Sequence, residues 1–114
     1  MAAGDVNTDG LATLEAEAKA LPGRVFGRRL DVSSEADVVA FVGWAKQQLG
    51  GLNGLVTNAG ILRDGLLVKK DRNTGDIVKL GTDAWNAVIG VNLTGATLMV
   101  REVVGEMAKA GDKG

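Results

Sequence analysis

The stretch "GLVTNAGI", residues 54–61, decides how this sequence folds. It joins a short apolar run, centred on Leu55 and Val56, to a polar loop that contains glycine. A short run of apolar and β-branched residues that is bounded by turn residues is typical of a β-strand. We therefore expect a strand centred on Leu55 and Val56, with residues 58–60 at its carboxyl end.

Helix and strand patterns alternate before this stretch. Residues 8–20 are rich in Ala, Leu and Glu and predict an amphipathic helix. Residues 24–30 predict a strand, and the adjacent Arg28 and Arg29 favour a place near the edge of a sheet. A second helix is expected to begin near Ser34, which has the spacing of a capping residue, and to end at a glycine pair.

Two further elements are expected after the stretch. Residues 65–80 predict a β-hairpin whose turn lies around residues 73–75. A long helix then runs from Thr82, its expected N-cap, to about Lys109, and the tail that follows it is expected to fray. Asn92 lies in the middle of this helix, where Asn is unfavourable. Two interpretations stand: a solvated or locally bonded side chain, or a functional one.

The residue types that are missing limit the chemistry. The 114 residues include no Cys, no His and no Tyr. Nucleophilic triads built on His or Cys, and metal sites built on the same residues, are thereby excluded. Acid–base work near neutral pH would need Asp, Glu or Lys with a displaced pKa.

The charge distribution limits the partners. The formal net charge is -1 and the charges of both signs are interspersed, so no nucleic-acid partner is expected. No uninterrupted apolar run reaches the roughly 20 residues of a membrane span, and no signal peptide is recognisable, so no membrane partner is expected either. The sequence therefore predicts a cytoplasmic location.

The stretch "GDVNTDG", residues 4–10, matches the first half of a calcium-binding loop. The twelfth position of that loop, where a bidentate Glu is required, is Ala16. The simpler interpretation is that Asn7 or Thr8 caps the following helix and that Gly10 eases the turn. Turn chemistry likewise explains the acidic residues of the expected hairpin, and no metal site is predicted.

Three strings carry a family resemblance: "LDVSSEADV" (30–38), "GLVTNAGI" (54–61) and "WNAVIGVNLTGAT" (85–97). In this order and spacing they resemble the short-chain dehydrogenase/reductase family of NAD(P)-dependent oxidoreductases, above all its 3-oxoacyl reductase-like members. The resemblance implies an α/β fold with a partial Rossmann-type parallel sheet, made of a remnant of strand 2 and strands 3 and 4. Flanking helices, a β-hairpin insertion and a long C-terminal helix complete it. Residues 1–114 would form one incomplete NAD(P)-binding domain, the central part of such an enzyme.

The resemblance also assigns roles to individual residues. Asp5 matches the acidic residue that hydrogen-bonds the adenosine ribose, which implies NAD as the cofactor in preference to NADP. Asp31 and Val32 match the pair that contacts the adenine ring. The string Asn58, Ala59 and Gly60 matches the motif that lines the cofactor site. Asn92 matches the helix residue that holds a water of the family's proton relay, and is the one catalytic candidate.

The sequence also departs from the family. It holds no G-x-G fingerprint for the pyrophosphate and no Tyr-x-x-x-Lys pair, so the chain by itself is expected to be inactive. The alternative function is a non-catalytic α/β module that keeps part of the cofactor site or dimerises. Because strand 1 of the Rossmann order is absent, strand 4 and the last helix would be left uncovered, and a homo-oligomer through residues 82–109 is expected.

Overall fold

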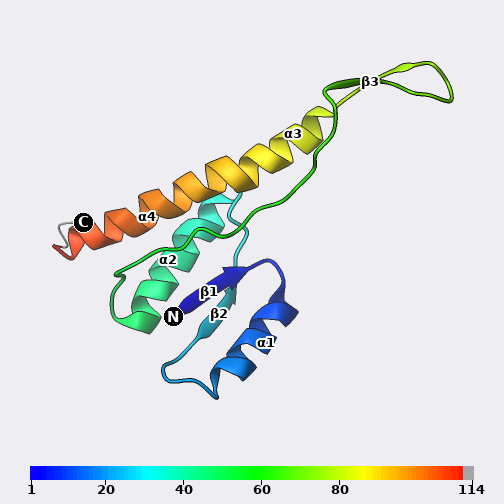
Figure 1. Ribbon diagram of the computed structural model, residues 1–114. Coiled ribbons are helices and arrows are strands. Elements are labelled where there is room, and N and C mark those ends of the chain that lie inside the picture. Colours follow the sequence, from blue (N-terminus) through cyan, green and yellow to red (C-terminus); the bar gives the residue numbers. More distant parts are fainter. Residues whose placement is uncertain (112–114) are drawn as a thin grey trace.

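The first part of the chain forms a parallel β–α–β unit in the computed structural model, which describes residues 1–111 (Figure 1). Strands β1 (Ala2–Asp5) and β2 (Phe26–Arg29) pair in parallel, with Ala2 opposite Phe26 and Asp5 opposite Arg29. Helix α1 (Thr8–Ala18) connects them and packs against β2. Helix α2 (Glu35–Leu49) follows β2 and contacts β1.

Local side-chain bonds set the ends of these helices. The Asn7 side chain accepts a hydrogen bond of 3.0 Å from the Gly10 amide at the start of α1. Ser34 does the same for α2, accepting from the Asp37 amide at 3.3 Å. Gly50 ends α2 in the left-handed conformation, with φ of 73°, which glycine adopts without steric cost. These contacts confirm the capping interpretation of residues 4–10 and the expected ends of the second helix.

Three consecutive segments form one long helix: α3 (Thr82–Ile89), the π-helical η1 (Gly90–Gly95) and α4 (Ala96–Lys109). The long helix lies beside α2 in Figure 1. The expected N-cap at Thr82 is wrong: Gly81 takes that position without a side-chain bond, because Thr82 is already helical. The π-helical segment contains Asn92, and π-helical segments are frequent at functional sites.

The core lies mainly between α2 and α4. One apolar cluster joins the inner faces of these helices to the end of β2, and its buried members are Leu30, Val38, Phe41, Val42, Ala45, Leu98, Met99 and Val103. Ion pairs at the rim, Lys46 with Glu106 and Arg101 with Glu35, link the same two helices. Docking of α4 on α2 thus holds the two halves of the chain together.

The fold class is confirmed as α/β with a small parallel sheet, but the number of strands needs a correction. No strand forms between residues 31 and 67, so the strand expected at Leu55 and Val56 is not formed. The sheet of the described residues contains only β1 and β2, and a strand needs a hydrogen-bonded neighbour. Val56 is 87% exposed.

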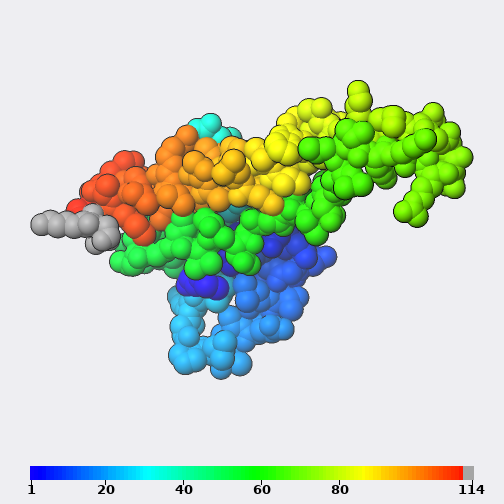
Figure 2. Space-filling model, turned by 45° about the horizontal axis from the view of Figure 1, so that its top comes forward, coloured from blue at the N-terminus to red at the C-terminus, as the bar shows by residue number. Residues whose placement is uncertain are grey.

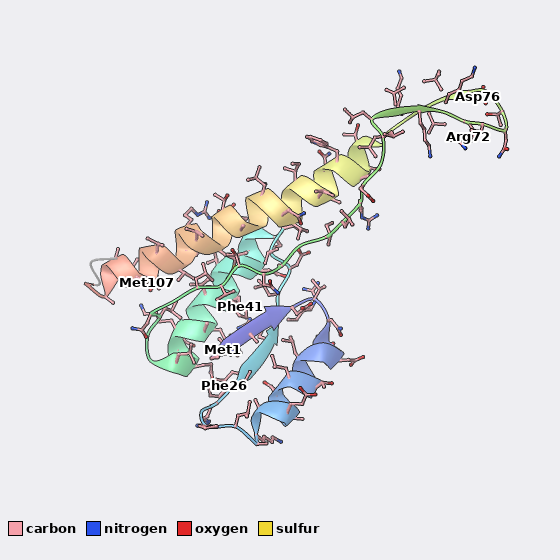
Figure 3. All side chains as sticks on the ribbon, viewed as in Figure 1. Met1, Phe26, Phe41, Arg72, Asp76 and Met107 are labelled. Carbon is pink, nitrogen blue, oxygen red and sulfur yellow. The ribbon has the colours of Figure 1, made fainter. Side chains whose placement is uncertain are left out.

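The predicted hairpin is confirmed. Strands β3 (Val68–Lys70) and β4 (Ile77–Lys79) pair antiparallel, and Gly75 takes a positive φ of 77° in the turn. The Asp71 side chain accepts hydrogen bonds from the amides of Asn73 and Thr74, which is the turn chemistry expected of this acidic residue. Figures 1 and 2 show the hairpin projecting from the end of α3, and Figure 3 places Arg72 and Asp76 at its outer end.

By length and composition alone, the helix from Thr82 to Lys109 could span a membrane. Its α4 part, however, buries Leu98, Met99 and Val103 against α2 and carries the ion pairs described above. A core helix of a soluble protein can meet the same criteria of length and composition. The last three residues of the tail that was expected to fray, 112–114, lie outside the described part of the chain.

Candidate functional site

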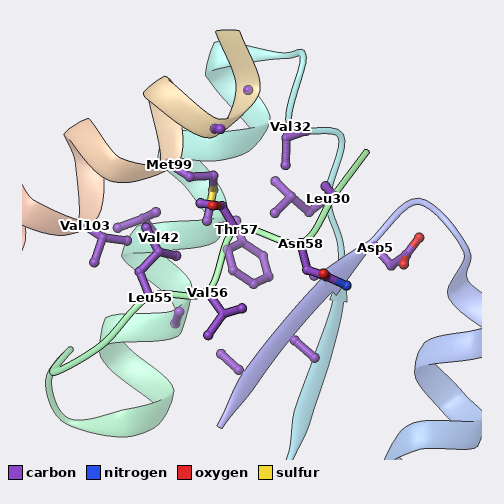
Figure 4. A pocket seen from close by; sticks show the side chains of 18 of the residues that line it. Asp5, Leu30, Val32, Val42, Leu55, Val56, Thr57, Asn58, Met99 and Val103 are labelled. Atoms are coloured by element: carbon purple, nitrogen blue, oxygen red, sulfur yellow. The ribbon is translucent and has the colours of Figure 1, made fainter. Parts of the chain in front are cut away.

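A groove of about 1170 Å³ opens between β1 and the extended segment of residues 52–61 (Figure 4). We call it the central groove. All six residues that the sequence assigned to a cofactor line it, although they come from three separate stretches: Asp5, Asp31, Val32, Asn58, Ala59 and Gly60. Asp5 ends β1, Asp31 and Val32 follow β2, and the other three lie near the end of the extended segment of residues 52–61. In open α/β sheets, ligands bind at the carboxyl ends of the strands.

Asp5 is the last residue of β1 and is exposed to solvent. Its Oδ1 accepts a hydrogen bond of 2.9 Å from the Asn7 amide, which fixes the direction of the carboxylate. Its Oδ2 makes no hydrogen bond with any of the described residues, so it can accept one from a ligand hydroxyl. One carboxylate oxygen thus holds the turn and the other faces outward.

Asp31 follows β2 and is held by Ser33. The Ser33 hydroxyl and the Ser33 amide both donate to Asp31 Oδ1, at 2.6 and 3.0 Å. These two bonds, the hydroxyl's first, lower the pKa of Asp31 below its ordinary value. Asp31 is therefore a carboxylate at neutral pH, with Oδ2 left for a donor from a ligand.

Asn92 does not line the central groove itself; it fixes the loop that does. Its Oδ1 accepts from the Ile61 amide at 2.8 Å, and its Nδ2 donates to the Ile61 carbonyl at 2.9 Å. This pair of bonds ties the end of the segment 52–61 to η1 and positions Asn58 to Gly60 at the groove. Asn92 is exposed, yet its side chain is bonded to a residue 31 positions away in the sequence and not to its own helix.

Gly95 sets the distance between η1 and the loop after β2. A Cβ atom at this position would lie 2.7 Å from Val32 Cγ2 and 3.0 Å from the Val32 carbonyl oxygen. Real Cβ atoms do not approach so closely, so glycine is needed here. The backbone of η1 consequently rests against Val32, one of the residues assigned to the adenine ring.

Three residues of the site were not anticipated: Ser33, Ile61 and Gly95. The spacing of Ser33 two residues after Asp31 is a signal for a local side-chain turn and could have been used. A glycine inside a helical pattern, as at Gly95, is a second signal, since it often marks a close packing contact. Nothing in the sequence pairs Ile61 with Asn92, because that contact depends on the fold.

The groove offers two carboxylates, at Asp5 and Asp31, and its other lining side chains are uncharged. It can therefore accept hydrogen bonds from hydroxyl or amino groups and cover a flat apolar ring. Among the described residues, no three acidic side chains gather as a metal site would require.

Comparisons with known proteins point to one family. A family model described as short chain dehydrogenase matches residues 1–114. The chain is 36% identical over 107 residues to the 3-oxoacyl-[acyl-carrier-protein] reductase FabG of Thermotoga maritima, covering 94% of this chain and 39% of that protein. It is 40% identical over 82 residues to a 3-alpha-(or 20-beta)-hydroxysteroid dehydrogenase of Mycobacterium tuberculosis, covering 72% of this chain and 28% of the relative.

Solved structures share the fold. A candidate short-chain dehydrogenase/reductase from Burkholderia xenovorans superposes with a TM-score of 0.78 at 25% identity, over 96% of this chain and 40% of that one. An alcohol dehydrogenase from Thermococcus sibiricus, solved with 5-hydroxy-NADP, gives a TM-score of 0.75 at 23% identity, over 96% of this chain and 43% of that one. The chain therefore spans less than half the length of the proteins it matches.

Proposed function

Because the chain belongs to the short-chain dehydrogenase family, we propose that it forms the adenosine-binding part of an NAD-dependent oxidoreductase that acts on an alcohol or carbonyl group. The observation that carries this proposal is the meeting of six residues from three stretches in one groove, at the carboxyl ends of the strands. NAD, when bound, supplies the redox chemistry; the residues of this chain bind and orient it.

The two carboxylates have separate tasks in this proposal. Asp5 Oδ2 accepts from a ribose hydroxyl, and its negative charge disfavours a 2′-phosphate, so NAD is preferred to NADP. Asp31, kept ionised by Ser33, accepts from the amino group of the adenine ring. Val32 covers the ring, in the position that the close approach of Gly95 fixes.

Asn92 supports the site through the loop that it holds. Its two bonds to Ile61 keep residues 58–60 at the groove. A proton-relay role for Asn92, which the family resemblance implies, would use the same geometry once substrate and a catalytic acid are present. The chain contains no tyrosine to act as that acid, so we expect no turnover by the chain alone.

Calorimetric titration with NAD and with NADP tests the proposal. We expect saturable NAD binding and weaker NADP binding. The variant Asp5→Asn keeps an oxygen that can accept from the Asn7 amide, but it removes the negative charge. It should therefore weaken NAD binding by on the order of ten-fold and bring the affinities for NAD and NADP closer together. Asp9→Asn is the matched control, because Asp9 also loses a charge near the start of α1 but does not line the groove.

The opposite results would refute the proposal. If the folded chain gives no heat of binding with NAD, or if Asp9→Asn weakens binding as much as Asp5→Asn, Asp5 does not recognise a ribose. Circular dichroism of each variant checks that the helices are intact.

A specific observation favours a second role, association with another copy through residues 82–109. Leu93, Val100 and Val104 are spaced as one helical face, and 60%, 47% and 53% of their surfaces are exposed. Sedimentation equilibrium should show a dimer or larger species that Val104→Lys dissociates. Val39→Lys is the control, since Val39 on α2 is exposed to a similar extent, 48%. A monomer at every concentration would rule this role out.

A further inference from the structure

The β3–β4 hairpin has an exposed face that mixes apolar and basic side chains. Val68 lies opposite Lys79 and Lys70 lies opposite Ile77 in the register. Directly opposite residues of an antiparallel pair share one face of the sheet, as do residues two apart on one strand. We call these four residues the basic hairpin face. All four are exposed, Val68 to 57% and Ile77 to 61%, and the face contains two ammonium groups and no carboxylate.

The two lysines of the basic hairpin face are not neutralised within one copy of the chain. Neither Lys70 nor Lys79 makes an ion pair with any residue of the described range 1–111. The strands β3 and β4 pack mainly on each other, and Figures 1 and 2 show the hairpin projecting away from α2 and the small sheet. The face is therefore open to a partner that carries negative charge.

Helix α1 offers the complementary charge. Residues 1–18 contain four carboxylates and no Lys or Arg. Two of the four are already in use, because Asp5 lines the central groove and Glu15 accepts a hydrogen bond from β2. The other two, Asp9 and Glu17, are exposed and make no ion pair with the part of the chain that the structure describes. They lie about two turns apart, so they share one side of the helix.

Other acidic partners fit the hairpin less well. Its outer end carries Arg72 and Asp76 (Figure 3), and burying such charged groups in a bilayer is costly. Residues 65–80 contain no aromatic side chain on which a nucleic-acid base could stack. The hairpin and α1 lie well apart in Figures 1 and 2, so the hairpin of one copy can meet α1 only on another copy.

We propose that the basic hairpin face binds helix α1 of a second copy of this chain. Lys70 and Lys79 of one copy lie against Asp9 and Glu17 of the other, and the apolar residues of the face cover the exposed Ala16 between them. Opposite charges speed the encounter and disfavour wrong pairings, and the covered apolar surface adds affinity. The contact is separate from the association through residues 82–109 and does not rest on cofactor binding.

Charge reversal tests the contact. The Val104→Lys chain is the background, because that substitution is directed against the association through residues 82–109. Sedimentation equilibrium at about 20 mM salt leaves exposed charges weakly screened. We expect an association that Lys70→Glu weakens at least ten-fold and that Glu17→Lys weakens to the same degree, because each substitution brings like charges together.

The decisive sample carries both substitutions on one chain. Lys70→Glu combined with Glu17→Lys should restore the association, because the reversed charges again attract each other between copies. Lys69 provides the matched control, since it neighbours Lys70 but lies on the opposite face of β3. Lys69→Glu alone should change the affinity by less than about two-fold. Lys69→Glu combined with Glu17→Lys, which has the same net charge as the restored chain, should stay as weak as Glu17→Lys.

Three outcomes would overturn the proposal. The background chain is a monomer at every concentration; or Lys69→Glu weakens association as much as Lys70→Glu; or the chain with both reversals associates no better than the single variants. Circular dichroism checks that each variant is folded. If Val104→Lys unfolds the chain, the same series on the chain without that substitution gives the same comparison. Calorimetry with NAD on the same samples shows separately whether the cofactor proposal holds.

Discussion

Replacing Gly95 by Ala tests whether the close contact between η1 and Val32 positions the site. Gly105 in α4 provides the matched control, since a Cβ atom there meets nothing within 4 Å. Both substitutions add one methyl group to the long helix. Only the one at residue 95 meets the Val32 side chain, at 2.7 Å, and the Val32 carbonyl oxygen, at 3.0 Å.

The expected magnitudes follow from two effects. Gly→Ala inside a helix stabilises it by about 1 kcal/mol, so Gly105→Ala should raise the free energy of unfolding by about that amount. Inserting an atom into a packed contact costs about 1–3 kcal/mol. Gly95→Ala should therefore lower the free energy of unfolding by roughly 0–2 kcal/mol, because the helix gain offsets part of the cost. The difference between the two variants, about 1–3 kcal/mol, isolates the contact with Val32.

Urea unfolding followed by circular dichroism measures both values on the same chain. In addition, Gly95→Ala should weaken NAD binding, because the displaced Val32 is assigned to the adenine ring, whereas Gly105→Ala should not. If the two variants stabilise the chain equally, the backbone of η1 does not rest on Val32 and the reasoning fails.

Three further predictions concern single contacts. Asn92→Ala should raise the exchange rate of the Ile61 amide roughly 5- to 150-fold, because two hydrogen bonds worth about 1–3 kcal/mol together are lost; an unchanged rate would show that other contacts hold the loop. The hydrogen bond from Lys109, and to a smaller extent the one from Lys46, lowers the pKa of Glu106 from 4.5 to about 2. Its contribution to stability is therefore complete above about pH 4.5 and lost as the pH falls toward 2, so urea unfolding of Glu106→Gln should depend less on pH in that window than unfolding of the unmodified chain. Ser34→Ala should lower the free energy of unfolding by about 1 kcal/mol through loss of the cap of α2, and a smaller change than about 0.5 kcal/mol would contradict that role.

Local signals in the sequence predicted the elements that depend on neighbouring residues. The caps at Asn7 and Ser34, the glycine end of α2 and the hairpin turn at Gly75 follow from rules that involve four or five consecutive residues, and each was confirmed. The six residues that the family strings assign to the cofactor line one groove, since the order of strands fixes which strand ends meet; their role toward a cofactor stays a prediction.

Contacts between distant residues explain what the sequence did not predict. The strand at Leu55 and Val56 has the right composition but lacks a hydrogen-bonded neighbour, so composition alone was insufficient. The bonds from Asn92 to Ile61 and the approach of Gly95 to Val32 depend on where η1 docks. The roles assigned to Asp5 and Asp31 toward NAD, the NAD preference, the homo-oligomer, the absence of nucleic-acid and membrane partners and the cytoplasmic location stay predictions.

The docking of α4 on α2 has a consequence for the folding kinetics of this chain. The ion pairs that join these helices connect residues 60 and 66 positions apart, Lys46 with Glu106 and Glu35 with Arg101. Closing so long a loop lowers the conformational entropy of the chain before the core contacts between α2 and α4 can form and offset that cost. The hairpin and the β1–α1–β2 unit, by contrast, involve short separations. We therefore expect the local units to form early and the collapse of the long helix onto α2 to limit the rate.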